Sequence, residues 1–115
     1  MAINYDNRRF RTIVGGESGD VTGDTLFHYR QEGDVVWATY SGGGVRMGSL
    51  IAKADEQGRL DMRYMHVGAD GELKTGVCKS VPEELRDGRL RVHEEWQWTC
   101  GDHSGGESVI EEVDE

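Results

Sequence analysis

Residues 90–98 read LRVHEEWQW, and apolar side chains alternate with polar ones along this stretch. One side carries the apolar members, which are Leu90, Val92, Trp96 and Trp98. The other side carries only polar members, which are Arg91, His93, Glu95 and Gln97. A period of two is typical of a β-strand with one apolar and one water-facing surface, whereas a helix spaces its apolar residues three and four apart. The stretch therefore predicts a half-buried strand.

The same alternation recurs in other windows, among them residues 27–30, 60–64 and 72–77. From these patterns we expect strands over residues 8–14, 22–32, 34–41, 44–54, 58–67, 71–80, 88–99 and 105–113. The one helix-like stretch is PEELR at residues 82–86, where proline followed by acidic residues favours a single helical turn.

Glycine and aspartate clusters separate the expected strands. The chain has 17 glycines and 1 proline, and its turn signals recur at intervals of roughly 8 to 14 residues, the rhythm of a β-meander. Short connections make successive strands antiparallel neighbours, and closing the meander removes its two exposed edges. We therefore predict an all-β, single-domain, antiparallel up-and-down β-barrel of about eight strands over residues 1–115, with a sandwich as the alternative.

The charge of the chain restricts its partners. Asp and Glu number 22 against 13 Lys and Arg, so the formal net charge is −9. Nucleic acid and anionic membranes repel such a protein, so neither is an expected partner. No stretch approaches the roughly 20 apolar residues that span a bilayer, and residues 1–6 lack the features of a signal peptide. We therefore expect a cytoplasmic protein with reduced thiols, although a pairing between Cys78 and Cys100 remains open. Neither cysteine has a CxxC neighbour, so no zinc or redox motif is expected.

Glu94 is the most unusual residue of the chain, because the alternation places its carboxyl group on the apolar face, between Val92 and Trp96. A buried carboxylate without a partner costs several kcal/mol, so it must be paired, hydrogen-bonded or protonated. Two interpretations stay open. Glu94 contacts a ligand inside the barrel, or it pairs with an Arg, Tyr or Thr of a neighbouring strand and sets the register.

Aromatic and polar residues complete the candidate site. Large aromatic surfaces suit an apolar or planar ligand, although tryptophans can equally fill a barrel core. The candidate ligand-binding residues are Tyr29, Trp37, Tyr64, His66, Glu94, Trp96 and Trp98. Within this set, Tyr64, His66 and Glu94 suggest a general acid–base group. Asp61 and Arg63 fall on the outer face and predict a cross-strand ion pair.

No metal or cofactor site is expected. The histidines at positions 28, 66, 93 and 103 lack the short spacing of zinc ligands. The chain has no GxSxG elbow and no phosphate-binding loop, because no helix is expected after the glycines at residues 42–44.

Several segments carry a resemblance to a known family. They are FHY (27–29), QEG (31–33), YSGG (40–43), LDMRY (60–64), DGELKTG (70–76) and HEEWQWT (93–99). The chain resembles, over nearly its whole length, a family of small bacterial proteins that often carry the automatic label N-acetylglutamate synthase. The resemblance implies a calycin-like barrel, similar in outline to avidins, lipocalins and fatty-acid-binding proteins, and it supplies no catalytic residues. An acetyltransferase of that name needs a mixed α/β domain with a glycine-rich turn opening a helix, so that activity is not expected here.

Three functions fit these observations. The first is a barrel that binds a small, partly apolar ligand. The second is an isomerase or cyclase that needs no cofactor and uses a lumen carboxyl group as acid or base. The third is a structural or interaction module, because residues 35–38 (VVWA) are apolar on both faces and suggest a homodimer contact.

Overall fold

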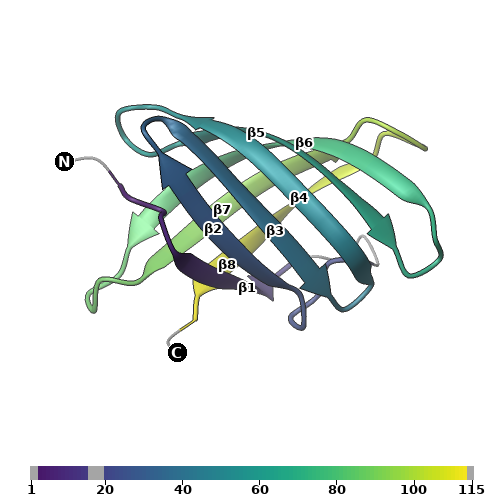
Figure 1. Ribbon diagram of the computed structural model, residues 1–115, viewed down its shortest axis with the longest axis horizontal. Helices are drawn as coiled ribbons and strands as arrows, with labels where there is room; N and C mark the ends of the chain where they lie inside the picture. Colours follow the sequence, from purple (N-terminus) through teal and green to yellow (C-terminus); the bar gives the residue numbers. More distant parts are fainter. Residues whose placement is uncertain (1–2, 16–19, 114–115) are drawn as a thin grey trace.

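Eight antiparallel strands close into a barrel in the computed structural model, which describes residues 3–15 and 20–113 (Figure 1). The strands are β1 (Arg8–Val14), β2 (Leu26–Glu32), β3 (Val35–Gly42), β4 (Val45–Ala54), β5 (Leu60–Gly68), β6 (Leu73–Glu84), β7 (Leu90–Trp98) and β8 (Gly105–Glu112). Each strand pairs with its neighbours in the sequence, and β1 pairs with β8. The predicted up-and-down barrel is confirmed, and the sandwich is wrong because the ladder of strand pairs is continuous. No helix of the described ranges is long and apolar enough to cross a membrane.

The predicted helical turn at residues 82–86 is wrong. Strand β6 continues through Pro82, which lies opposite Val92 of β7. Strand β5 pairs with β6 only as far as Ser80, so one side of β6 has no neighbouring strand beyond that residue. Sheets accept proline beside such an open edge, since the missing N–H removes no ladder bond there.

The start of the second predicted strand also differs from the structure. Strand β2 begins at Leu26 rather than at residue 22. Residues 22–25 form a turn instead, in which the Thr25 amide donates to the Thr22 carbonyl over 3.0 Å. The Thr25 hydroxyl donates to the Gly42 carbonyl at 2.9 Å and ties this turn to the end of β3. Local hydrogen bonds of threonine thus compete with the hydrogen bonds between strands, so β2 begins later in the sequence than predicted.

Side chains fill one end of the barrel, near the β4–β5 hairpin. Phe10 packs edge-on against Tyr29 with 4.8 Å between ring centroids, and Tyr5 lies against Tyr29 at 5.8 Å. The Tyr5 hydroxyl donates to the Gly58 carbonyl, which ties the segment before β1 to that hairpin. The same core holds Val36, Ala52, Leu60, Leu90, Val92 and Ile110. Because each of the larger apolar side chains contributes about 1.5–3 kcal/mol when fully buried, this end stabilises the barrel.

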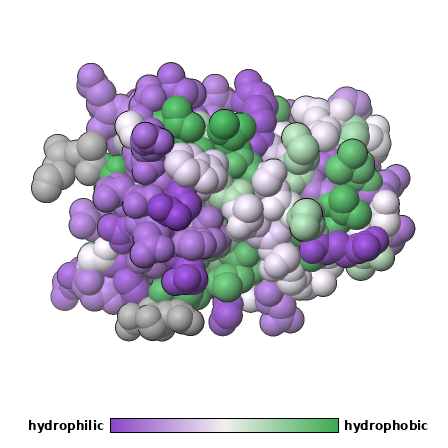
Figure 2. All heavy atoms as spheres, viewed as in Figure 1, coloured by the Kyte–Doolittle hydropathy of each residue, from purple (hydrophilic) through white to green (hydrophobic). Residues whose placement is uncertain are grey.

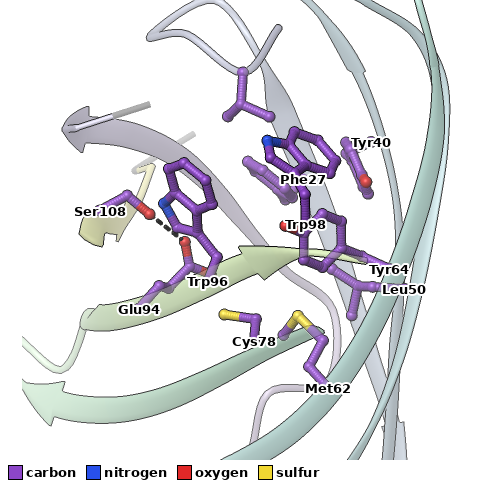
Figure 3. A pocket seen from close by; sticks show the side chains of 11 residues that line it. Phe27, Tyr40, Leu50, Met62, Tyr64, Cys78, Glu94, Trp96, Trp98 and Ser108 are labelled. Carbon is purple, nitrogen blue, oxygen red and sulfur yellow. Dashed lines mark hydrogen bonds between the residues drawn. The ribbon is translucent and has the colours of Figure 1, made fainter. Parts of the chain in front are cut away.

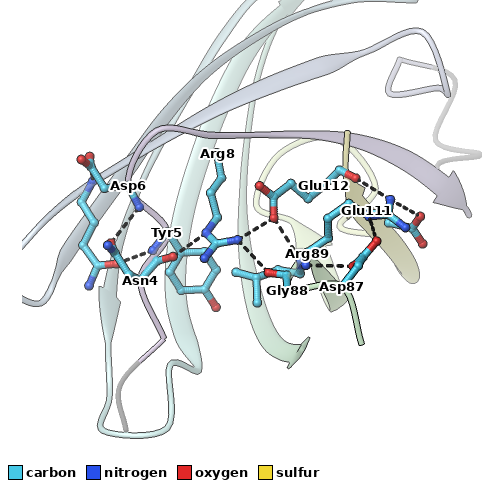
Figure 4. A network of polar contacts seen from close by, with 11 residues as sticks. Asn4, Tyr5, Asp6, Arg8, Asp87, Gly88, Arg89, Glu111 and Glu112 are labelled. Atoms are coloured by element: carbon cyan, nitrogen blue, oxygen red, sulfur yellow. Dashed lines mark hydrogen bonds and ion pairs between the residues drawn. The ribbon is translucent and has the colours of Figure 1, made fainter. Parts of the chain in front are cut away.

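A polar network covers the same end (Figure 4). Arg8 Nη1 donates to Glu112 Oε1 over 2.6 Å, and the same oxygen accepts the Leu90 amide at 3.0 Å. Arg89 Nη1 donates to Glu111 Oε2 over 3.1 Å. These contacts join β1, β8 and the β6–β7 hairpin where the barrel closes. The paired charges therefore fasten the seam rather than form a binding site.

Candidate functional site

The other half of the barrel is hollow. A cavity of about 60 Å³ lies between the strands, with room for a few water molecules. Its walls are mostly aromatic or aliphatic, as Figure 3 shows. The lining residues are Val21, Phe27, Tyr40, Leu50, Met62, Tyr64, Cys78, Glu94, Trp96, Trp98 and Ser108.

Glycines opposite the aromatic residues keep this half open. Gly48 pairs with Tyr40, and Gly76 pairs with Tyr64. Gly106 pairs with Trp96, and a methyl group at this glycine would lie 2.7 Å from the indole. Methyl groups at Gly48 and Gly76 would overlap the tyrosine rings opposite them. Each ring therefore lies across the glycine of the next strand, close to the barrel wall, and leaves the centre of the lumen free.

The rings around the cavity stand at steep angles to one another. Trp98 meets Tyr64 at 61° with 5.5 Å between centroids, and it meets Trp96 at 63° and 6.1 Å. The rings of Phe27 and Tyr40 are an exception, because they stack at an angle of 29° with 4.8 Å between centroids. Edge-to-face and stacked contacts both hold aromatic side chains in fixed positions. The cavity therefore has aromatic walls on several sides.

Glu94 extends into this cavity from β7. The residue is half-buried and lines the cavity. The Ser108 hydroxyl, on β8, donates to Glu94 Oε1 over 2.9 Å. Burial raises the pKa of Glu94 to about 7, and the hydrogen bond from Ser108 offsets only part of this effect. The carboxyl group is therefore poised between its neutral and charged forms near neutral pH.

Glu94 has no positively charged partner among the residues that the structure describes. The titratable groups coupled to it are hydroxyls and a thiol. Burial raises the pKa values of Tyr29, Tyr64 and Cys78, and the charge of Glu94 raises them further. These groups are therefore neutral at pH 7, and among the described residues of the cavity lining only Glu94 titrates there.

Two buried hydroxyl groups near the lumen lack a hydrogen-bond partner within the described ranges. They are Tyr29 Oη and Thr12 Oγ1. An unsatisfied buried hydroxyl costs about 1–3 kcal/mol. Tyr29 is fully buried and close enough to Glu94 for the carboxylate charge to affect its pKa. The region of the lumen next to Glu94 thus has unused hydrogen-bonding capacity.

A second polar cluster fixes the rim of the hollow half. The Asp20 carboxylate accepts hydrogen bonds from His66 Nε2 at 2.9 Å and from Lys74 Nζ at 2.7 Å. Burial alone would raise the pKa of Asp20, but these two hydrogen bonds outweigh it and lower the pKa below 3.8. The other ring nitrogen of His66 lies 3.0 Å from the Tyr40 hydroxyl. Val21, which follows Asp20, lines the cavity, so the cluster holds the β1–β2 connection against the barrel mouth.

Four of the seven predicted site residues line one cavity. They are Tyr64, Glu94, Trp96 and Trp98. Tyr29 and His66 are buried on the inner face but outside the cavity lining, with 0% and 1% of their surface exposed. His66 is bound to Asp20, so the suggested acid–base group of Tyr64, His66 and Glu94 is not assembled. One of the two interpretations of Glu94 named an Arg, Tyr or Thr of a neighbouring strand as its partner, and the partner in the structure is Ser108.

The predicted position of Trp37 is wrong. Its neighbours Val36 and Ala38 point inward, whereas Trp37 lies on the outer face opposite Ile51, with 37% of its surface exposed. The segment at residues 35–38 is apolar on both faces, so its alternation carried no information on which side faces the lumen. The pairing of β3 with β4 shows which face of β3 points into the lumen.

Sequence reasoning missed several lining residues. Phe27 lies on an alternating segment and could have been found from it, whereas Cys78 and Ser108 carry no local signal. Tyr40 comes directly before a glycine-rich turn, and it was not recognised as a lining residue. Cys78 and Ser108 come near Glu94 through the pairing of β7 with β6 and β8, whereas Phe27 and Tyr40 come near it only across the closed barrel.

A larger hollow of about 460 Å³ lies beside the β4–β5 hairpin. Its charged side chains are exposed, and most of them form ion pairs, for example Arg59 with Asp55 at 2.7 Å and Lys53 with Asp34 at 3.0 Å. The predicted ion pair between Asp61 and Arg63 is also present, at 2.8 Å, but it lies within β5 rather than across strands. The charges of this hollow face water and most of them are paired, so the lumen is the better candidate site.

The comparison with known families agrees with this geometry. The family model described as avidin-like protein matches residues 3–113. No curated protein matches the chain. The match and the closed eight-stranded barrel confirm the calycin-like outline.

Proposed function

The chain belongs to the avidin-like family, and on this premise we propose that it binds a small, partly apolar molecule in the hollow half of its barrel. The observation that carries the proposal is a cavity bordered by aromatic rings and by Glu94, whose carboxyl group has a serine hydroxyl as its hydrogen-bond partner. Apolar pockets with a few convergent polar groups are the usual form of small-molecule sites.

The glycine pairs support an open lumen. A barrel of eight strands can fill its interior with side chains or hold one small ligand. Here Gly48, Gly76 and Gly106 stand opposite large rings, so that the rings cover the wall instead of the centre. The filled end limits the depth of the site, and the cavity of about 60 Å³ favours a compact ligand.

Native mass spectrometry of protein purified from its host tests the proposal. We expect a bound small molecule that dissociates on denaturation and whose occupancy falls in a Trp96→Leu variant. Trp37→Leu is the matched control, because it makes the same change on the outer face. Absence of any bound molecule, together with no change of tryptophan fluorescence on adding a broad set of small molecules, would contradict the proposal.

One observation favours a second candidate, an isomerase or cyclase that needs no cofactor. A carboxyl group with a pKa of about 7 can donate and accept a proton near neutral pH. If the retained molecule is a substrate, it should be recovered as a mixture of isomers of equal mass. A Glu94→Gln variant should then hold one isomer only, and a single isomer in both proteins argues for binding alone.

We also propose that a second copy of the chain covers the outer face of β3 to β6. Members of the avidin-like family are often oligomeric. Figure 2 shows hydrophobic side chains among hydrophilic ones on one face of the molecule. Exposed apolar residues of these strands include Trp37, Met47, Ile51, Met65 and Leu73. Light scattering should report a dimer that Ile51→Lys dissociates, and a monomer at high concentration rules out this contact.

The proposed location of the protein is the cytoplasm. Cys78 and Cys100 are both free thiols, which agrees with a reducing compartment.

A further inference from the structure

We propose that the lumen selects a compact organic cation, a methylated ammonium group, which pairs with Glu94 inside the aromatic walls. The inference rests on the proposed function, since it names the ligand class for the same cavity.

The charge balance of the cavity favours a positively charged ligand. Within the part of the chain that the structure describes, Glu94 is the one lining residue that can be charged at neutral pH, and no cation there pairs with it. The groups that face it from other elements are the hydroxyls of Tyr5, Tyr29, Tyr40 and Tyr64 and the thiol of Cys78, all kept neutral by burial. A carboxylate in such surroundings favours an opposite charge nearby, because Coulomb attraction is strong where water is excluded. A positively charged ligand supplies that charge, whereas an anion would be repelled.

The aromatic walls of the cavity also favour a cation. The face of an indole or phenol ring carries negative electrostatic potential and attracts cations, with tryptophan the strongest. Trp96, Trp98 and Tyr64 border the same cavity as Glu94 and meet at angles of 61° and 63°. A group of aromatic rings around one site is the arrangement that binds quaternary ammonium ions. Within the chain itself, Lys74 Nζ already lies 6.0 Å from the Trp98 ring centroid.

The polar content of the cavity distinguishes methylated from bare ammonium groups. A bare ammonium ion carries strong hydrogen-bond donors that each need an acceptor when buried. The lining offers few acceptors besides Glu94, and most of its surface is carbon or sulfur. Methyl groups fit such walls without unsatisfied donors, so a methylated cation retains the charge and loses less hydration.

The site should also couple binding to proton release. A cation pairs with the ionised form of Glu94, so at low pH a proton must leave before the ligand binds. With a pKa of about 7 for the free carboxyl group, the affinity should be about tenfold weaker at pH 6 than at pH 8. A neutral ligand that accepts a hydrogen bond from protonated Glu94 would show the opposite trend.

The test titrates the intact protein with tetramethylammonium chloride and follows tryptophan fluorescence, with sodium chloride at equal ionic strength as the salt control. A parallel titration uses tert-butanol, a neutral molecule of similar size and shape. We expect saturable binding of tetramethylammonium, a dissociation constant about tenfold higher at pH 6 than at pH 8, and a loss of about tenfold or more in Glu94→Gln. Glu95→Gln, the same change on the outer face of β7, should bind as the wild type does.

The outcomes separate this inference from the proposed function. If tert-butanol binds and tetramethylammonium does not, the cation is the wrong ligand class and the lumen is still a binding site. If tetramethylammonium binds equally well to Glu94→Gln, its pairing with Glu94 is refuted. If neither compound binds, the cation inference is overturned, and the molecule retained in native mass spectrometry decides the proposed function independently.

Discussion

Replacing Glu94 by glutamine should stabilise the protein above pH 7 and leave its stability nearly unchanged near pH 4. Glutamine has the shape of a protonated glutamic acid and can still accept the hydrogen bond from Ser108. Burial raises the pKa of Glu94 from 4.5 to about 7. The folded protein therefore holds this proton more tightly than the unfolded chain does.

The sign and size of the effect follow from proton linkage. Because the folded pKa is the higher one, the contribution of the protonated group is fully present below pH 4.5 and is lost as the pH rises to about 7. One pKa unit corresponds to about 1.4 kcal/mol, so the interval from 4.5 to about 7 amounts to about 3 kcal/mol. The wild type carries this penalty above pH 7, and the glutamine variant does not.

Urea denaturation followed by tryptophan fluorescence measures the difference directly. The free energy of unfolding is determined for both proteins in pH steps across the range from acidic to mildly alkaline. Other titrating groups are common to the two proteins, so their effects cancel in the difference. Glu95→Gln, on the outer face of the same strand, should differ from the wild type by no more than about 0.5 kcal/mol. A difference between Glu94→Gln and wild type that does not vary with pH would refute the reasoning, as would a less stable variant at pH 8.

Two further changes probe the walls and the rim of the cavity. Gly76→Ala should destabilise the protein by about 1–3 kcal/mol, because the added methyl group overlaps the Tyr64 ring. Gly23→Ala, whose methyl group would meet its nearest neighbour at 3.5 Å, is the control, and equal losses in urea denaturation would contradict the role of the glycine pair. Asp20→Asn should lower the free energy of unfolding at pH 7 by about 1–3 kcal/mol, because it weakens the hydrogen bonds from His66 and Lys74. Since these bonds lower the folded pKa of Asp20, the difference should shrink as the pH falls below 3.8, and a loss of stability that persists in full at about pH 3 would show that charge plays no part.

The strand pattern was predictable because it is local. A two-residue period says which neighbours along the chain share a face, and the turn residues say where the chain reverses. For this reason residues 90–98 were sufficient to place Glu94, Trp96 and Trp98 on one side of a strand. The same rule failed at Trp37, where both faces of the strand are apolar. A different local signal failed at Pro82, where proline and acidic residues favoured a helical turn, because the acceptance of proline in β6 depends on where β5 stops pairing.

The cavity was not predictable, because it depends on the register between paired strands, which the alternation within one strand does not give. The alternation shows that Tyr64 and Trp96 point inward, but only the pairing of β5 with β6 and of β7 with β8 places Gly76 and Gly106 opposite them. Ser108 likewise becomes the partner of Glu94 through β8. A shift of one residue in either pairing would turn these side chains to the opposite face of the sheet. The sequence of a single strand does not fix its register with the neighbouring strand.

The amino-acid sequence alone thus determined the barrel fold and the inward face of β7, since both arise from contacts between near neighbours in the chain. Closure of the barrel decided which half is filled, which half is hollow, and that Glu94 faces aromatic rings without a cation among the described residues. These properties depend on groups that are brought together from several strands, so they exist only once the sheet has closed on itself.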